Sequence, residues 1–483
     1  MIYFSHKESE LLGLKYVMDK IRTGSPYGRA FKKSVSFYGV EKERDLISEL
    51  ERTKSLSEIL PSLKAEYEHL FMMFEEIRDI RNLILSLKEG AVLSELDLYE
   101  IKYMLTGMKN IQREKKRILG EEYNLHELEE LRRILDPQGS GLNTFYVYDE
   151  YDETLKKIRM RKRDIEMRIR KAENEKDKEA CLAERRAAVL QEEHAEYLVR
   201  KELTAKIMSF RERILANMDT LGQMDYLLAK AKLSADFETC LPEVGKDRPI
   251  SMVNGYHPYF ESKIRQRDRK FSRISLCLEK GSTLLCGANM GGKSITLKTV
   301  FLNTVLVQMG ILPFAEKMMT PVLDRMDLLC EDAENPDRGL STFGGEVMKI
   351  REIMESLSDS PSLLVLDEPA RGTNPVEGTA IAGGLLQYFR KKQHFLLMAS
   401  HYDLKDIEGV RRYQVRGLKD VDLDSHIRNT DEDRQAEVRL LSELMDYTLE
   451  KWDGTKVTGD AVRIGEYLGF SRELTKEIRK LLE

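Results

Sequence analysis

The chain contains a run of residues with the pattern G-x-x-x-x-G-K-S, which forms phosphate-binding loops. It lies between an apolar run that ends at Cys286 and a helical pattern that follows. Glycines let backbone N–H groups close around phosphate oxygens, and the N-terminus of the next helix adds partial positive charge. We predict that Lys293 neutralises the β- and γ-phosphates and that the Ser294 hydroxyl binds Mg²⁺. The alternative is a glycine-rich turn that matches by chance. The predicted loop residues are Gly287, Ala288, Asn289, Met290, Gly291, Gly292, Lys293 and Ser294.

Three further polar residues follow apolar runs. Asp367 and Glu368 come directly after Ser362–Leu366. We predict that Asp367 holds the Mg²⁺ shell and that Glu368 polarises an attacking water as general base, although two acids also end many ordinary strands. His401 follows a third run, Phe395–Ala399, where a histidine can reach the terminal phosphate. The alternative for His401 is a structural role.

The elements that must position these residues differ between the two halves of the chain. Nine of the twelve prolines lie between Pro242 and Pro375, and twenty of the thirty glycines follow residue 240. From about residue 245, short apolar runs alternate with helical patterns, which predicts the buried strands of an α/β sheet. These strands are expected at Ser282–Cys286, Ser362–Leu366 and Phe395–Ala399.

Residues 42–236 show a helical pattern instead. Asp136-Pro137 stops one helix, and residues 138–148 are a break that we interpret as a short strand pair. A highly charged run from 152 to 216 has sparse apolar positions, which predicts a projecting antiparallel helix pair with a narrow seam. Its expected seam residues are Leu182, Val189, Leu198 and Leu203.

Composition excludes several classes of protein. The 78 basic and 83 acidic residues give a net charge of −5, and residues Met1–Glu8 show no signal-peptide pattern. The apolar stretch Ile295–Phe314 is interrupted by polar residues, so we expect a buried helix and no membrane partner. The five cysteines form no CxxC pair, which fits a reduced, cytoplasmic protein.

Near the end, Tyr447–Trp452 and Lys456–Val457 flank Asp453-Gly454, a hairpin signal. Two helices then finish the chain. The first is expected to end at Gly469, and the second to start after Ser471 as its N-cap.

These segments resemble the ATPase domain of the MutS family, a branch of the ABC-type ATPases. Gly287–Ser294 is similar to that family's G-P-N-M-x-G-K-S, Asp367–Pro375 to its D-E-I-G-R-G-T-S-T, and Met398–Tyr402 to its F-A-T-H-Y. Gly255–Pro258 matches the stretch just before the family's nucleotide domain. Gly459–Leu482 looks like its C-terminal helix–turn–helix.

The resemblance implies a mixed fold. Residues 1–240 would form an all-α lever domain whose short coiled-coil clamp spans about 152–216. Residues 241–483 would form the α/β P-loop ATPase domain, which ends in dimerisation helices at about 457–483. The resemblance also implies ATP and Mg²⁺ as cofactors and a homodimer. In that dimer Ser341 and Thr342, followed by Phe343 and then Glu346, belong to the signature segment that completes the other subunit's ATP site.

The departures from the family pattern bear on function. Ala288 replaces the usual proline, and Pro369-Ala370 replace Ile-Gly. From the sequence we expect no counterpart of the mismatch-reading domain with its Phe-x-Glu wedge and no nuclease module after the last helices. ATP hydrolysis is therefore expected, whereas mismatch recognition is placed in doubt.

Three functions follow from this comparison. The first is a DNA-binding ATPase in mismatch repair or recombination, and the nine Lys and Arg between Lys156 and Lys171 could contact its phosphate backbone. The same strip could equally be the solvated face of a helix pair. The second is a reactivating factor that opens a client enzyme, namely a cobalamin-dependent aminomutase such as the lysine aminomutase. The third, a chromosome-cohesion type ATPase, is disfavoured because the charged helices are too short for its arms.

Overall fold

The computed structural model describes residues 6–266, 271–287, 292–330, 342–402, 404, 407–417, 446–452, 460–467 and 469–482. The chain divides into two compact units. Unit 1 comprises Met1–Ile21, Ser36–Glu58 and Lys230–Glu483, and unit 2 comprises Arg22–Val35 and Ile59–Ala229. Segments of the two units therefore alternate along the sequence.

This division differs from a single boundary at residue 240, because part of the N-terminal half packs into unit 1. Leu46 and Leu50 of α4 (Glu43–Ile59) are fully buried in one apolar cluster with residues from the far half of the chain. The latter residues are Val307, Leu312, Met318 and Val322. Burial of each side chain of this size stabilises the folded state by about 1.5–3 kcal/mol. This cluster therefore holds α4 in unit 1.

The secondary structure of unit 2 consists of helices joined by turns and loops, and all of its residues are described. The prediction of a helix-dominated first half is therefore confirmed. Its helices are α3 (Pro26–Ser34), η2 (Leu60–Leu63), α5 (Lys64–Glu76), α6 (Arg81–Leu85), α7 (Glu95–Glu114), α8 (Lys116–Leu119), α9 (Glu129–Leu135), η3 (Asp149–Tyr151), α10 (Glu153–Lys171), α11 (Glu175–Ser209) and most of α12 (Arg211–Asp236).

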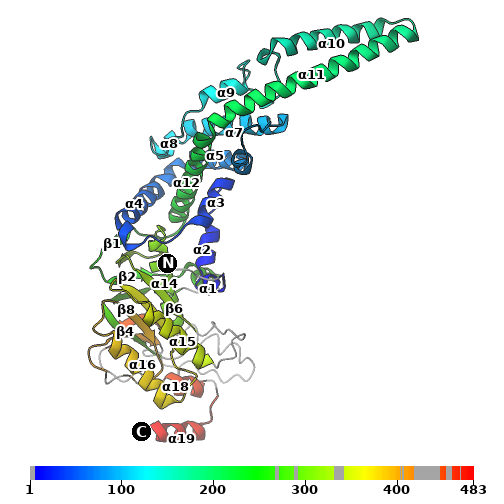
Figure 1. Cartoon of the computed structure of the whole chain (residues 1–483). Coiled ribbons are helices and arrows are strands. Elements are labelled where there is room, and N and C mark those ends of the chain that lie inside the picture. Colours follow the sequence, from blue (N-terminus) through cyan, green and yellow to red (C-terminus); the bar gives the residue numbers. More distant parts are fainter. Residues whose placement is uncertain are drawn as a thin grey trace. The chain divides into compact units, whose positions relative to one another are not determined.

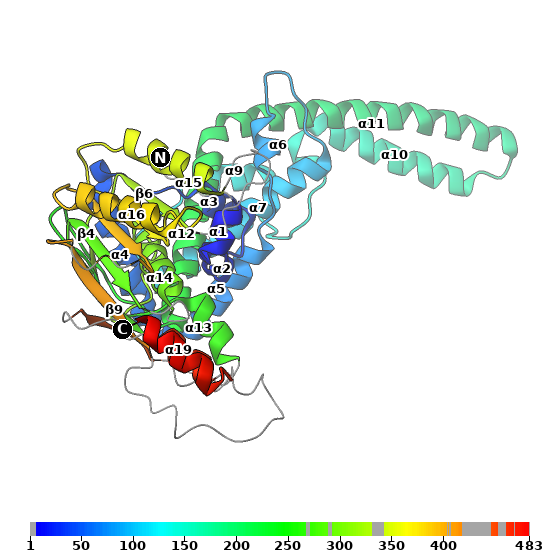
Figure 2. The ribbon, with the colours of Figure 1, turned by 90° about the horizontal axis from the view of Figure 1, so that it is seen from below.

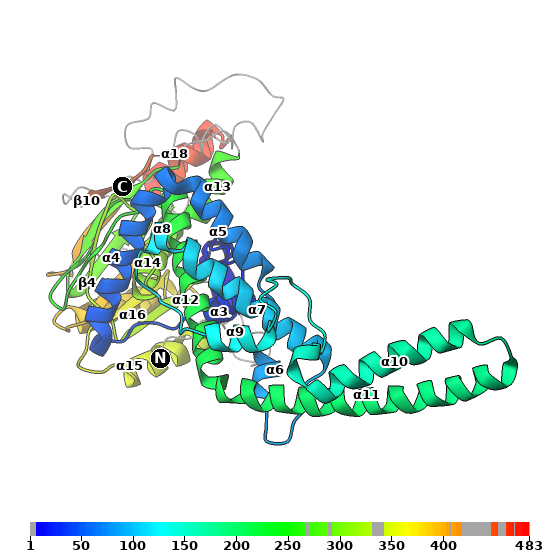
Figure 3. The same ribbon diagram turned by 90° about the horizontal axis from the view of Figure 1, so that it is seen from above.

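The antiparallel helix pair predicted for the charged run is present. Helices α10 and α11 run side by side in every view and extend away from the other helices of unit 2 (Figure 1, Figure 2 and Figure 3). Between them, Arg159 donates to Glu192 at 3.0 Å and to Glu196 at 2.7 Å, and Lys162 also pairs with Glu192. We call residues 153–209 the arm.

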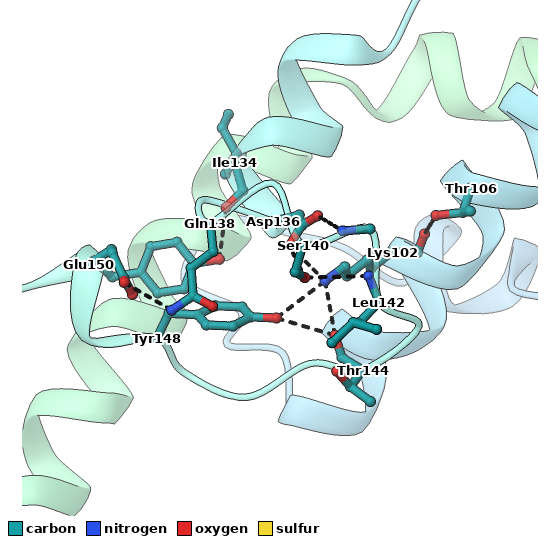
Figure 4. Close-up of polar contacts among 12 residues, drawn as sticks. Lys102, Thr106, Ile134, Asp136, Gln138, Ser140, Leu142, Thr144, Tyr148 and Glu150 are labelled. Atoms are coloured by element: carbon teal, nitrogen blue, oxygen red, sulfur yellow. Dashed lines mark hydrogen bonds and ion pairs between the residues drawn. The ribbon is translucent and has the colours of Figure 1, made fainter.

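The expected strand pair at 138–148 is wrong, because side-chain hydrogen bonds hold this segment as an irregular loop. The Asp136 carboxylate accepts hydrogen bonds from the Ser140 hydroxyl at 2.9 Å and the Gly141 N–H at 2.8 Å (Figure 4). The buried Lys102 ammonium of α7 donates to Asp136 at 3.2 Å and to the Thr144 carbonyl at 2.9 Å. Backbone groups bound in this way are not available for a strand ladder.

Unit 1 contains two sheets. The smaller has the strand order β1-β5-β2-β3 and the larger β10-β9-β4-β8-β7-β6. The strands are β1 (Glu243–Val244), β2 (Ile250–Gly255), β3 (Ile274–Leu278), β4 (Gly281–Cys286), β5 (Lys317–Thr320), β6 (Arg325–Leu329), β7 (Ser362–Asp367), β8 (Phe395–Ala399), β9 (Arg411–Gly417) and β10 (Asp446–Lys451). All three strands expected from the apolar runs are present, as β4, β7 and β8.

Helices α14 (Lys293–Gln308) and α16 (Pro375–Phe389) pack on the larger sheet. Apart from these and α4, the helices of unit 1 are α1 (His6–Leu11), α2 (Leu14–Lys20), η1 (Val40–Lys42), the end of α12, α13 (Pro258–Arg265), α15 (Thr342–Glu355), α18 (Asp460–Tyr467) and α19 (Arg472–Leu482). Leu386 and Phe389 of α16 pack on the sheet in one buried cluster with Ile353 of α15. Helix α14 is buried on nearly all sides, as its apolar sequence predicts.

The chain end agrees with the sequence pattern where it is described. Helix α19 begins after Ser471, whose hydroxyl accepts the Leu474 N–H at 3.2 Å as an N-cap. The turn and second strand of the expected hairpin, residues 453–457, lie outside the described residues. Within the described residues, no helix is both long and apolar enough to span a membrane.

Candidate functional site

The ends of three parallel strands bring the predicted site residues to one edge of the larger sheet. In the register of β4, β8 and β7, Leu285 and Asp367 both lie opposite Ala399. The phosphate-binding loop leaves β4, Glu368 follows β7, and His401 follows β8. Because parallel strands share their carboxyl edge, loops distant in sequence meet there, at the usual ligand position of open α/β sheets.

Lys293 and Gly287, which flank the loop that follows β4, are in direct contact. The Lys293 side chain, only 3% exposed, donates from Nζ to the Gly287 carbonyl at 2.8 Å. Gly287 and Gly292 have φ of 135° and 75°, and a Cβ on Gly292 would lie 2.8 Å from the Tyr447 ring. Glycine is therefore required at 292. The predicted contacts of Ala288, Asn289, Met290 and Gly291 lie outside the described residues.

Asp367 and Ser294 face each other across this edge. Burial raises the pKa of the Asp367 carboxyl, while a hydrogen bond from Ser294 and the charges of Lys298 and Lys293 oppose that shift. One carboxylate oxygen, Oδ1, is buried and has no hydrogen-bond partner. A buried acceptor of this kind is costly to leave unpaired. A carboxylate and a hydroxyl are also ligands that Mg²⁺ accepts, so the residues present fit this cation.

Glu368 lies among three cationic or ionisable groups. Its Oε1 is 3.4 Å from Lys293 Nζ, and its Oε2 is 3.6 Å from His401 Nδ1 and 3.7 Å from Arg371 Nη1. The carboxylate is 12% exposed, whereas His401 is 35% exposed. The histidine side chain is therefore the more accessible to solvent of the two.

The signature segment is described only in part. Ser341 lies outside the described residues, and Thr342 is the first residue of α15, with nothing described of its side chain. Further along α15, both Glu346 carboxylate oxygens accept the Ala370 N–H at 3.1 Å. The Tyr402 hydroxyl donates to the Ala370 carbonyl at 2.9 Å. No local pattern in the sequence predicts this contact of Tyr402, although the residue stands next to His401.

Other metal sites are not indicated. Among the residues that the structure describes, no group of three or more His, Cys, Asp or Glu side chains is placed to hold a metal ion. All five cysteines are free thiols, as the sequence predicts.

Comparison with known proteins places the site in a family domain. MutS domain V matches residues 283–461 of this chain. Endonuclease MutS2 of Finegoldia magna is 29% identical over 243 residues, which cover 49% of this chain and 30% of the relative. Endonuclease MutS2 of Acetivibrio thermocellus is 32% identical over 204 residues, which cover 42% of this chain and 25% of the relative. The chain thus spans between 25% and 30% of the length of these relatives.

Proposed function

This chain is a MutS-family protein, and on that premise we propose that it binds ATP with Mg²⁺ and hydrolyses it to ADP and phosphate. The observation that carries the proposal is the position of the Glu368 carboxylate, 3.4 Å from Lys293 and beside the Asp367–Ser294 pair. A base, a phosphate-binding cation and a pair of Mg²⁺ ligands then meet at one sheet edge. We further propose that it acts on DNA in repair or recombination.

Each residue has a role that follows from its chemistry. Lys293 and the loop N–H groups bind the β- and γ-phosphates, and Ser294 with Asp367 would hold Mg²⁺. The bound cation neutralises charge on the phosphate oxygens. Glu368 takes a proton from the attacking water at a carboxylate oxygen, and His401 donates a hydrogen bond toward the terminal phosphate. Lys293 changes its partner from the Gly287 carbonyl to phosphate when ATP enters.

The dimer is part of the same proposal. Ser341 and Thr342 of one subunit would complete the ATP site of the other, with α18 and α19 supporting the association. Closure would then be driven by the γ-phosphate and relaxed by hydrolysis.

Lys293→Ala tests the ATPase. We expect loss of hydrolysis in a phosphate-release assay, whereas Lys391→Ala, at an exposed position of the same unit, should keep it. The wild type should also dimerise with ATP in analytical ultracentrifugation. Full activity in Lys293→Ala, or a wild type that stays monomeric with ATP, would contradict the proposal.

The DNA role rests on the arm. Of the nine basic residues between Lys156 and Lys171, Arg159, Lys162 and Arg168 are paired with glutamates of α11. Five others are exposed, and they offer the positive charge that a phosphate backbone requires. These are Lys157, Arg161, Arg163, Arg170 and Lys171.

Salt dependence separates DNA from a protein client. If the arm binds duplex DNA, the slope of log K against log salt should become shallower by about 0.9 for each phosphate contact removed. We therefore expect Lys157→Gln with Arg161→Gln to reduce the slope, while Lys64→Gln, at an exposed position of α5, leaves it unchanged. No DNA binding at low salt would exclude the DNA role and favour the alternative, an aminomutase-reactivating factor.

A further inference from the structure

The turn after the two carboxylates has an unusual backbone. Glu368 has a φ of 51° and Ala370 a φ of 63°, so two residues with side chains adopt the left-handed conformation within three positions. Each such residue costs roughly 1–2 kcal/mol. Strain of this kind persists only where the surrounding structure holds it. Contacts with neighbouring residues must therefore stabilise the 368–370 turn in this conformation.

Ala370 is held through both polar groups of its main chain. Its N–H donates to both oxygens of the Glu346 carboxylate, and its carbonyl accepts the Tyr402 hydroxyl. Ala370 is only 2% exposed, so water cannot readily replace either partner. Loss of Glu346 or Tyr402 would leave a buried backbone group unpaired, which costs about 1–3 kcal/mol.

Glu346 and Tyr402, which bind the main chain of Ala370, lie close in sequence to other predicted site residues. Glu346 lies on α15, one turn after Thr342, and Tyr402 follows His401 at the end of β8. The fold makes room for the Tyr402 hydroxyl, because a Cβ at Gly378 would lie 2.2 Å from its oxygen. Glycine at the start of α16 thus permits this contact. At its other end, the turn is tied to β8 by the Glu368 N–H, which donates to the Ala399 carbonyl at 2.9 Å.

We propose that Glu346 and Tyr402 are positioning residues that fix the 368–370 turn and so aim the Glu368 carboxylate at the attacking water. This inference rests on the proposed ATP hydrolysis. Glu346 and Thr342 share α15, so a shift of that helix when the signature segment meets nucleotide moves the Ala370 N–H and the carboxylate. Among the described residues, the side-chain hydrogen bonds of Glu346 and Tyr402 go to the main chain of Ala370, beyond the phosphate-binding residues. We therefore expect the two residues to govern the rate of hydrolysis and to leave the affinity for ATP unchanged.

The test compares paired variants. Glu346→Ala removes the acceptor, Glu346→Gln keeps an acceptor oxygen at the same length, and Tyr402→Phe removes only the hydroxyl. Glu355→Ala, on the exposed face of α15, and Tyr388→Phe, on α16, are matched controls. For each variant, kcat and KM for ATP, the Kd of a non-hydrolysable ATP analogue and the Tm are measured.

A reacting group misplaced by about 1 Å can cost about a hundredfold in rate, so a partly loosened turn should lower kcat at least about tenfold in Glu346→Ala. Tyr402→Phe should lower kcat about three- to tenfold, since one hydrogen bond of about 1 kcal/mol is lost. Glu346→Gln and both controls should stay within about threefold of the wild type, and the Kd of the analogue should not change. If Glu346→Ala does not fold, the kcat of Tyr402→Phe alone tests the inference.

The outcomes are distinct. Wild-type kcat in both Glu346→Ala and Tyr402→Phe, or a weakened Kd with unchanged kcat, would overturn this inference and leave the proposed ATPase intact. A wild type without any ATP hydrolysis would overturn the proposed function and this inference with it.

Discussion

Replacement of Lys102 by methionine should loosen the loop that leads into the arm. Lys102 is 3% exposed, and its ammonium donates to the Asp136 carboxylate, the Thr144 carbonyl and, at 3.2 Å, the Tyr148 hydroxyl (Figure 4). Methionine keeps the length and the aliphatic packing of the side chain but donates no hydrogen bond. The carboxylate of Asp136 would then be buried without its cation.

The size of the effect follows from these contacts. Removal of one partner from a buried ion pair costs about 3–5 kcal/mol. Asp136 keeps its hydrogen bonds from Ser140 and Gly141, which favours the lower end of that range. Because 1.4 kcal/mol is a factor of ten, about 3 kcal/mol corresponds to a change of about a hundredfold in the local opening equilibrium.

Hydrogen exchange measures this opening directly, without the assumption that a two-unit chain unfolds in one step. Amides of residues 136–151 should lose about a hundredfold of their protection in Lys102→Met. The control is Lys109→Met, whose exposed pair with Glu129 is worth at most about 1 kcal/mol. If the loop amides of Lys102→Met keep their protection within about fivefold of the wild type, the buried pair does not anchor the loop.

Two more predictions concern the nucleotide site and acid stability. Glu368→Gln should lower ATP hydrolysis about 10²- to 10⁴-fold, because a general base is lost, while nucleotide binding persists; unchanged turnover would remove Glu368 from that role. His257 donates from Nε2 to the Leu12 carbonyl at 2.9 Å, and burial lowers its pKa from 6.5 to about 4. The folded state thus binds fewer protons than the unfolded state between these values, so stability is full above pH 6.5 and falls on acidification. Between pH 7.5 and 5 the loss should be about 2 kcal/mol, seen as a lower Tm. His257→Gln should flatten this pH dependence, and an equally steep profile would show that other groups cause it.

The arm illustrates where sequence reasoning succeeded and where it went wrong. The antiparallel pair was predictable from charge density and helical spacing. The buried residues of α11 were predicted only in part: Leu203 is 2% exposed, whereas Leu198, also expected inside, is 49% exposed. The buried positions of α11 include the smaller Cys181 and Ala188, which pack with Ile165. Hydrophobicity alone predicts that the larger apolar side chains are buried between the helices, but close approach of two helices favours small side chains at the contact. Ion pairs such as Arg159 with Glu192 occupy other positions between α10 and α11.

By itself the sequence determined the features that depend on local patterns. A glycine loop, three apolar strands and the acids or histidine that follow them are short-range signals, and each strand lies where its residues predict. Only the tertiary structure decided which of these ends are neighbours. Lys293, Glu368 and His401 are brought together by the order β4-β8-β7, which differs from their order in the chain. The hydrogen bonds of Glu346 and Tyr402 to the main chain of Ala370 also became known only from the tertiary structure. A hydrogen bond to the backbone of a distant segment leaves no periodic pattern in the sequence.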